Sequence, residues 1–158
     1  MSAKDDRLLL LHCVALVVYR IRHLCRPLKD YSGEIVTARN TKASVTITSA
    51  ALAALFDVPA VVILVAENKV AFFESVGDIA PQEAEFDAAL SSAATGTVQL
   101  AEVYPESRVD FWPVATASGQ RAVIGLAFDP DRRPDIPETL IDVISSILAL
   151  ALDRQQTS

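Results

Sequence analysis

Two apolar segments constrain the fold of this chain more than any other feature. Residues 60–66 are a continuous run of small and β-branched apolar residues, and residues 122–128 form a second apolar run. β-Branched residues favour strands, and a strand that is apolar on both faces must be covered on both faces. The sequence therefore predicts a β-sheet that lies between two layers of helices.

Short turns and helical periodicity place the other elements around these strands. Glu67-Asn68 is a turn into the next strand, and Thr116-Ala-Ser-Gly119 joins two strands into a hairpin. In chain order the sequence predicts helices at 45–56, 82–94 and 137–154, and strands at 60–66, 69–74, 97–103, 108–115 and 120–128. Strands joined by short turns run antiparallel. The expected fold class is α/β, of the α+β kind, with a central antiparallel sheet of five to six strands.

The N-terminal segment is predicted to be a helix over residues 5–27 that ends at Pro27. It is apolar almost all round, at Leu9, Cys13 and Leu16 on one side and at Leu10 and Val14 on the other. This is more apolar surface than one small domain covers. The segment therefore predicts contact with a partner chain, as a buried or dimer-forming helix.

Other interpretations of this helix stay open. Residues 8–19 are twelve residues long, whereas a membrane-spanning helix needs about 20 apolar residues. A signal peptide has an apolar region of this length, but Asp5 and Asp6 precede it and no small-residue cleavage site follows. A basic flank follows at Arg20, Arg22, His23 and Arg26. Such a flank is typical of the cytoplasmic side of a membrane. Direct membrane insertion is not expected, although a longer parent protein could be anchored in the inner membrane.

Composition argues against a nucleic-acid partner and against disulfides. The 158 residues carry a net charge of -6, so there is no basic stripe to neutralise phosphates. Cys13 and Cys25 would lie about 18 Å apart on one helix, which is too far for a disulfide. They are predicted to be free buried thiols of a cytoplasmic protein.

The residues that could carry catalysis are few and poorly placed. Neither His12 nor His23 is followed by the acidic residue that a phosphoacceptor histidine requires, and the spacing of His and Cys matches no metal site. No glycine-rich phosphate loop or nucleophile elbow is present. Arg132-Arg133 is interpreted as a solvated turn in a Pro/Asp loop. The chain is therefore predicted to be non-catalytic, without a metal or cofactor.

Four stretches carry a family resemblance: Leu55-Phe-Asp-Val-Pro-Ala-Val-Val-Ile-Leu64, Phe111-Trp-Pro-Val114, Val123-Ile-Gly-Leu126 and Leu148-Ala-Leu-Ala-Leu-Asp-Arg154. They resemble GAF sensory domains, and more closely the GAF-like domain of KdpD-type potassium-sensing histidine kinases. The family's glycine–threonine run before the third strand is reduced here to Thr95-Gly-Thr97. This departure weakens the case for a ligand shared through that loop.

The resemblance implies a regulatory part of a two-component sensor kinase. Residues 1–42 would be a signalling and dimerisation helix with a linker, and residues 43–158 the GAF-like domain. Its terminal helices would pack together, form a homodimer and pass a signal to the rest of the kinase. The alternative is a stand-alone module that binds a small molecule and has no kinase attached.

The resemblance also suggests a ligand pocket between the sheet and the helix that follows the second strand. Its predicted lining is Phe73, Phe86, Tyr104, Phe111, Trp112 and Arg121. Aromatic rings beside one arginine suit an anionic ring compound, and core packing explains the same aromatic residues equally well. Trp112 shares a strand face with Asp110, which indicates that this face is wet at one end.

Overall fold

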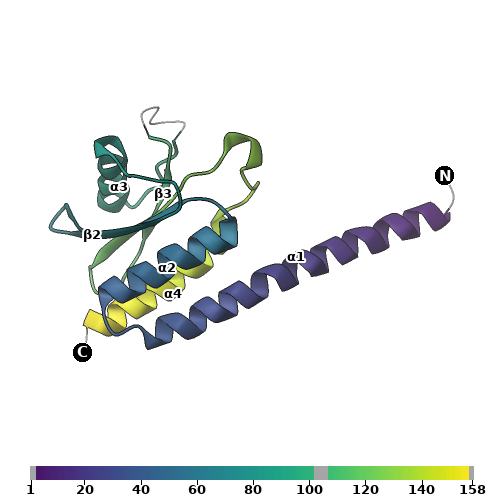
Figure 1. Ribbon diagram of the computed structural model, residues 1–158, viewed down its shortest axis with the longest axis horizontal. Helices are drawn as coiled ribbons and strands as arrows, with labels where there is room; N and C mark the ends of the chain where they lie inside the picture. The colour runs from purple at the N-terminus through teal and green to yellow at the C-terminus, as the bar shows by residue number, and fades with distance from the viewer. Residues whose placement is uncertain (1–2, 102–106, 157–158) are drawn as a thin grey trace.

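The computed structural model describes residues 3–101 and 107–156, with the side chains of Ala3 and residues 20–22 left out. Four helices and four strands make up most of the described chain (Figure 1). They are α1 (Ala3–Thr37), α2 (Thr41–Phe56), β1 (Ala60–Ala66), β2 (Lys69–Val76), α3 (Glu83–Thr95), β3 (Asp110–Val114), β4 (Arg121–Leu126) and α4 (Glu138–Gln156). A 3-10 turn, η1 (Pro130–Arg132), lies between β4 and α4.

The four strands form one antiparallel sheet in the order β2-β1-β4-β3. The two apolar runs are neighbours at its centre, where Ile63 of β1 lies opposite Val123 of β4. Both runs are buried along almost their whole length. The prediction that both runs are strands covered on both faces is therefore confirmed.

Helices cover both faces of this sheet. Residues Val62, Leu64 and Ile124 pack on the side of α2, α4 and the second half of α1. Residues Val61 and Ile63 point the other way and pack beneath α3. Figure 1 shows α2 and α4 side by side on one side of the sheet and α3 on the other. The predicted three-layer α+β architecture is confirmed, as is the packing of the terminal helices against each other.

The sheet has fewer strands than expected. No strand forms at 97–101, the described part of the strand predicted at 97–103, where Gln99 makes a single bridge to Phe111. The backbone N–H of Ala101 donates instead to the side chain of Asp110, at 2.8 Å. A side chain thus takes the hydrogen bond that a strand ladder would have used, and the described sheet has four strands rather than five or six.

The predicted end of the first helix at Pro27 is wrong, because α1 runs on through this proline to Thr37. Proline removes one helical hydrogen bond and usually ends or kinks a helix. Here the following turns are held by tertiary contacts, since Tyr31 and Ile35 are buried against α2 and α4 and Leu28 packs beside them. Packing therefore overrides the local signal of the proline.

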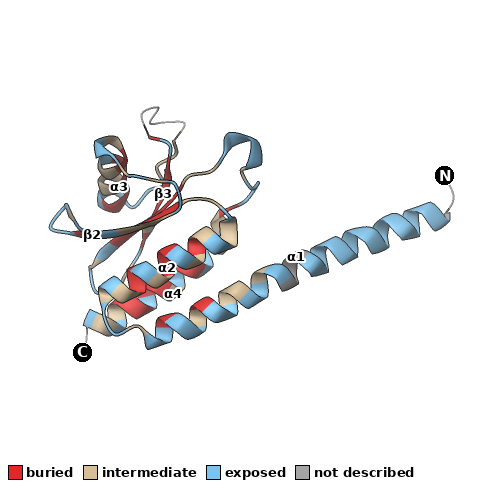
Figure 2. Ribbon diagram, in the orientation of Figure 1, coloured by how far each residue is buried: buried red, intermediate tan, exposed pale blue. Residues whose placement is uncertain are grey.

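The first half of α1 extends away from the rest of the molecule. Every described side chain from Lys4 to Tyr19 is exposed, as Figure 2 shows in pale blue. Cys13 and Cys25 are exposed too, so the prediction of buried thiols is wrong. By length and composition α1 could cross a membrane, and none of its apolar window is buried.

Candidate functional site

Three of the six predicted pocket residues lie on the face of the sheet that α3 covers. Phe73 of β2 and Phe86 of α3 contact each other edge to face, with ring centroids 5.1 Å apart. Phe111 of β3 is fully buried in the same layer. The structure therefore brings these three aromatic residues to one side of the sheet.

The other three predicted residues do not join them. Trp112 follows Phe111 in β3, so its side chain points to the opposite face and packs in the layer of α2 and α4. Arg121 begins β4 and is exposed. Tyr104 falls outside the described residues. Phe111 and Trp112 therefore do not line one cavity, and the six residues do not form a single pocket. Ligand binding by Phe73, Phe86 and Phe111 stays a prediction.

Side chains fill the middle of the layer beneath α3. A Cβ atom placed on Gly125 would lie 2.6 Å from Cγ1 of Val61 and 2.7 Å from Cε1 of Phe111. α3 faces these residues with Ala88 and Ala89, whose small side chains let the helix lie close to the sheet. Open space on this side is found at the edge of the layer.

A cavity of about 400 Å³ opens at that edge, between the start of α3 and the segment that leads into β3. Its lining is Asp78, Ile79, Ala80, Gln82, Ala84, Glu85, Arg108, Val109 and Ala127. The carboxylate of Glu85 accepts a hydrogen bond from the backbone N–H of Gln82 at 3.0 Å, which closes a capping box on α3. Apolar walls with carboxylates and one guanidinium can bind a small polar molecule.

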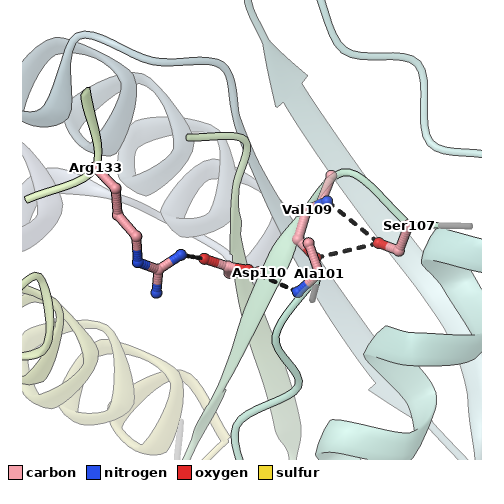
Figure 3. Close-up of polar contacts among 5 residues, drawn as sticks. All are labelled: Ala101, Ser107, Val109, Asp110 and Arg133. Atoms are coloured by element: carbon pink, nitrogen blue, oxygen red, sulfur yellow. Dashed lines mark hydrogen bonds and ion pairs between the residues drawn. The ribbon is translucent and has the colours of Figure 1, made fainter. Parts of the chain in front are cut away.

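An ion pair with a buried carboxylate holds the chain segments on either side of this region. Asp110, at the start of β3, is 3% exposed, and its carboxylate pairs with Arg133 and accepts the N–H of Ala101 (Figure 3). A buried carboxylate is stable only when it is paired and hydrogen-bonded. The pair therefore joins the segment before β3 to the loop after β4.

A serine closes the turn immediately before β3. The hydroxyl of Ser107 accepts the backbone N–H of Val109 at 3.2 Å and donates to its carbonyl at 3.1 Å (Figure 3). Ser107 is itself buried. Together with Asp110, it fixes the path of the chain into β3.

Aromatic residues extend the ion pair into the core. The guanidinium of Arg133 lies over the ring of Phe128, 5.3 Å from its centroid, and Phe128 packs edge to face against Trp112 at 6.2 Å. Trp112 is 3% exposed, and its indole N–H has no hydrogen-bond partner within the part of the chain described. A charged loop residue is thereby connected through two rings to the layer that contains α4.

The end of α4 is attached to the hairpin turn between β3 and β4. The carboxylate of Asp153 accepts the backbone N–H groups of Ala117 at 3.0 Å and Ser118 at 2.9 Å. Hydrogen bonds from the Ser118 side chain and from these backbone groups lower the pKa of Asp153. Movement of the turn would therefore be transmitted to α4 through these two hydrogen bonds.

The same end of α4 also contacts the passage from α1 to α2. The side-chain amide of Gln155 donates to the carbonyl of Ala38 at 3.3 Å and to the hydroxyl of Ser44 at 2.9 Å. Arg154 reaches the carbonyl of Ile35 at 3.5 Å. Consecutive residues of α4 thus join the sheet, the end of α1 and the start of α2.

Sequence reasoning missed most of these contacts. Arg132 is exposed, as expected for a solvated turn, but Arg133 is half-buried and pairs with Asp110. Asp110 is buried, so the expectation that the start of β3 is wet is wrong. Asp110 is a lone aspartate at the start of an otherwise apolar strand, and this position indicates that it needs a charged partner. Its partner is 23 residues away, and no local pattern connects the two.

Comparison with known proteins is informative at the level of structure. No protein-family model matches the sequence, and no curated protein matches it significantly. Several solved structures match the fold of this chain. The native GAF domain of the potassium sensor histidine kinase KdpD from Escherichia coli superimposes with a TM-score of 0.69 at 18% identity, over 84% of this chain and 95% of that one.

A second GAF domain, from an Acinetobacter phosphoenolpyruvate-protein phosphotransferase, superimposes with a TM-score of 0.61 at 13% identity. It covers 84% of this chain and 94% of that one. Two GAF domains from different proteins thus share the arrangement of layers described above. The chain has the GAF fold.

Proposed function

We propose that this chain is a non-catalytic sensory domain of a two-component sensor histidine kinase of the KdpD type, and that its terminal helices carry the signal. The observation that carries the proposal is the end of α4, where Asp153, Arg154 and Gln155 contact the hairpin turn, α1 and α2. A change in the sheet would reach both terminal helices through these contacts. The similarity in fold to the KdpD GAF domain motivates the choice of a KdpD-type kinase for this proposal.

The proposal includes a parallel homodimer through the terminal helices. Exposed apolar side chains lie along them at Val36 of α1 (65% exposed) and at Val143 and Leu150 of α4 (44% and 71%). Val143 and Leu150 are seven residues apart and share a helix face. Val36 and Leu150 line one groove between α1 and α4. A second copy would cover this surface and join two α1–α4 pairs into a bundle.

Sedimentation of the purified chain tests the dimer. We expect a concentration-dependent dimer in the micromolar range, and we expect Leu150→Glu to shift it to monomer without loss of helical signal. Leu150 is exposed, so this substitution leaves the core intact. A wild-type chain that stays monomeric at every concentration would contradict the dimer.

A small-molecule-binding module without a kinase is the second candidate, and the cavity of about 400 Å³ beside α3 favours it. A screen of thermal stability separates the two, because a ligand that binds the folded state raises the melting temperature. Nucleotides, cyclic dinucleotides and potassium ions are the compounds to test. Stabilisation that is lost in Arg108→Ala would favour the binding module, and kinase sequences next to the gene would favour the sensor.

The absence of catalysis and the cytoplasmic location belong to the same proposal. Incubation with radiolabelled ATP is expected to leave the protein unlabelled. A stable label on His12 or His23 would overturn the non-catalytic assignment. The domain itself is proposed to lie on the cytoplasmic side, where its exposed cysteines stay reduced.

A further inference from the structure

The rest of the described chain leaves the first half of α1 uncovered. All described side chains from Lys4 to Tyr19 are exposed, and the helix first lines a surface shared with the domain at His23 and Leu24. Figure 2 shows this half as an exposed rod that extends from the body. Large apolar side chains are thus presented to the surroundings over several helical turns.

These side chains cover the whole circumference of the helix. Leu8, Leu9, Leu10 and Leu11 are each exposed by 66–68%. Consecutive residues of an α-helix are about 100° apart, so four in a row face every direction. Further along, Val14 and Val17 are both 54% exposed. Apart from His12, the exposed side chains from Leu8 to Tyr19 are apolar around the whole helix.

This distribution decides between the two occupants that could cover it. A second copy in a two-stranded coiled coil covers one stripe of the helix and leaves the opposite side in water. A lipid bilayer surrounds a helix on all sides, and a helix satisfies its own backbone hydrogen bonds there. The observed exposure therefore fits lipid better than a second chain.

Length and flanking charges agree with this choice. Residues 8–25 contain two charged residues, Arg20 and Arg22, and span about 27 Å, close to the roughly 30 Å of a bilayer core. Both arginines lie near the domain-side end of this segment in the sequence, and basic residues are typical of the cytoplasmic end of a membrane-spanning helix. The charged residues Lys4, Asp5, Asp6 and Arg7 lie just beyond the other end.

We propose that residues 8–25 of α1 cross a lipid bilayer and hold the domain against one membrane surface. The proposal departs from the sequence-based expectation of no membrane insertion. It does not depend on the sensory role proposed above. The groove that contains Leu150 is lined by residues outside this segment.

The two cysteines offer a test with an internal control, since both are exposed and lie about 18 Å apart along the helix. An environment-sensitive dye is attached to Cys13 in Cys25→Ser, or to Cys25 in Cys13→Ser, on the full chain. Each protein is reconstituted into vesicles of phosphatidylcholine and phosphatidylglycerol. We expect blue-shifted emission and protection from aqueous quenchers at Cys13, while the dye at Cys25 stays quenchable.

Other outcomes would overturn the proposal. Equal shifts at both positions would indicate a helix that lies flat on the membrane. A Cys13 dye already protected in lipid-free buffer, and unchanged by vesicles, would indicate a second copy of the chain. No shift at either position would exclude insertion.

A pair of matched variants separates lipid binding from dimerisation. Val14→Asp places a charge near the middle of the segment and is expected to weaken vesicle binding about 100-fold or more. Leu150→Asp places the same charge on an exposed apolar position of α4 and is expected to leave vesicle binding unchanged. Neither position is buried, so both variants should melt as the wild type does. Equal binding by Val14→Asp and the wild type would overturn the proposal.

Discussion

At the scale of single residues, the donor can be identified in one buried hydrogen bond between two hydroxyl groups. The Tyr31 and Thr48 hydroxyl oxygens are 2.9 Å apart, and the Thr48 hydroxyl also donates to the carbonyl of Ser44 at 2.7 Å. Threonine has one hydroxyl hydrogen. Tyr31 must therefore donate to Thr48, and the two substitutions that break the pair are not equivalent.

The Tyr31–Thr48 pair predicts an asymmetry in stability. Tyr31→Phe removes a donor and should cost about 0.5–1.5 kcal/mol of unfolding free energy. Thr48→Val leaves the buried Tyr31 hydroxyl without an acceptor and should cost about 1–3 kcal/mol. Urea unfolding of both variants measures the difference. Equal losses, or a larger loss in Tyr31→Phe, would contradict the assigned direction.

Tyr31 also predicts a pH dependence. Burial raises the pKa of Tyr31 to about 12. Its contribution to stability is fully present below pH 10, the unfolded value, and is lost as the pH rises through about 12. Melting temperatures measured across this window should fall less steeply in Tyr31→Phe. Parallel curves for wild type and variant would show that other groups govern alkaline unfolding.

Gly125 is required by close contact, because its φ angle is ordinary and its Cβ position is filled. Gly125→Ala would place a methyl group 2.6 Å from Val61 and should destabilise the fold by about 1–3 kcal/mol. Gly33→Ala is the matched control, since no atom lies within 4 Å and α1 gains about 0.5–1 kcal/mol of helix propensity. Chemical denaturation should therefore move in opposite directions for the two variants, and a harmless Gly125→Ala would contradict the close packing.

At the scale of elements, Asp153 attaches α4 to the hairpin turn. Hydrogen bonds lower the pKa of its carboxyl, so its stabilising effect is present above the ordinary range near pH 4 and is lost as the pH falls through the lowered value. Asp153→Asn should lower the melting temperature at pH 7. The difference from the wild type should shrink as the pH falls through the lowered pKa of Asp153 and should disappear once that carboxyl is protonated. A difference that persists in acid would mean that the carboxylate charge is not its cause.

Local caps set the ends of two helices, and tertiary contacts set the end of a third. α2 and α3 begin and end where capping residues place them, at Asn40 and Gln82 on one side and at Asp57 and Gly96 on the other. α1 instead passes through Pro27, because the turns beyond it are buried against two other helices. A cap acts within a few residues, whereas burial of a whole helix face outweighs one lost hydrogen bond.

At the scale of the molecule, α1 has two parts. The described side chains of residues 4–19 are exposed, whereas Tyr31 and Ile35 of the second half are buried against the domain. The predicted domain boundary at residues 42 and 43 remains a prediction, and deletions test it. Every side chain described between residues 4 and 19 is exposed, so removal of residues 1–19 should leave the melting temperature within about 2 °C of the wild type. Removal of residues 1–37 takes away Tyr31 and Ile35, at about 2–5 kcal/mol each, and should unfold a domain of ordinary stability. A stable fragment 38–158 would support the boundary predicted from sequence.

The sequence alone determined the layers of this protein. Continuous apolar strands, turn residues and helix caps act over two to eight residues, so they identify β1, β2, β4, α2 and α3 without knowledge of the fold. The alternation of side chains along a strand also places Phe111 and Trp112 on opposite faces. The predicted pocket, which included both residues, was inconsistent with this alternation.

The tertiary structure alone decided the contacts between distant segments. Asp110 meets Arg133, Gln155 meets Ser44, and α1 continues beyond Pro27, because the loops bring these residues together only after the layers have packed. The candidate cavity beside α3 arises in the same way, from segments around Asp78, Glu85 and Arg108 that no short pattern connects. Contacts between residues far apart in the sequence depend on the path of the whole chain, and a local sequence pattern does not determine that path.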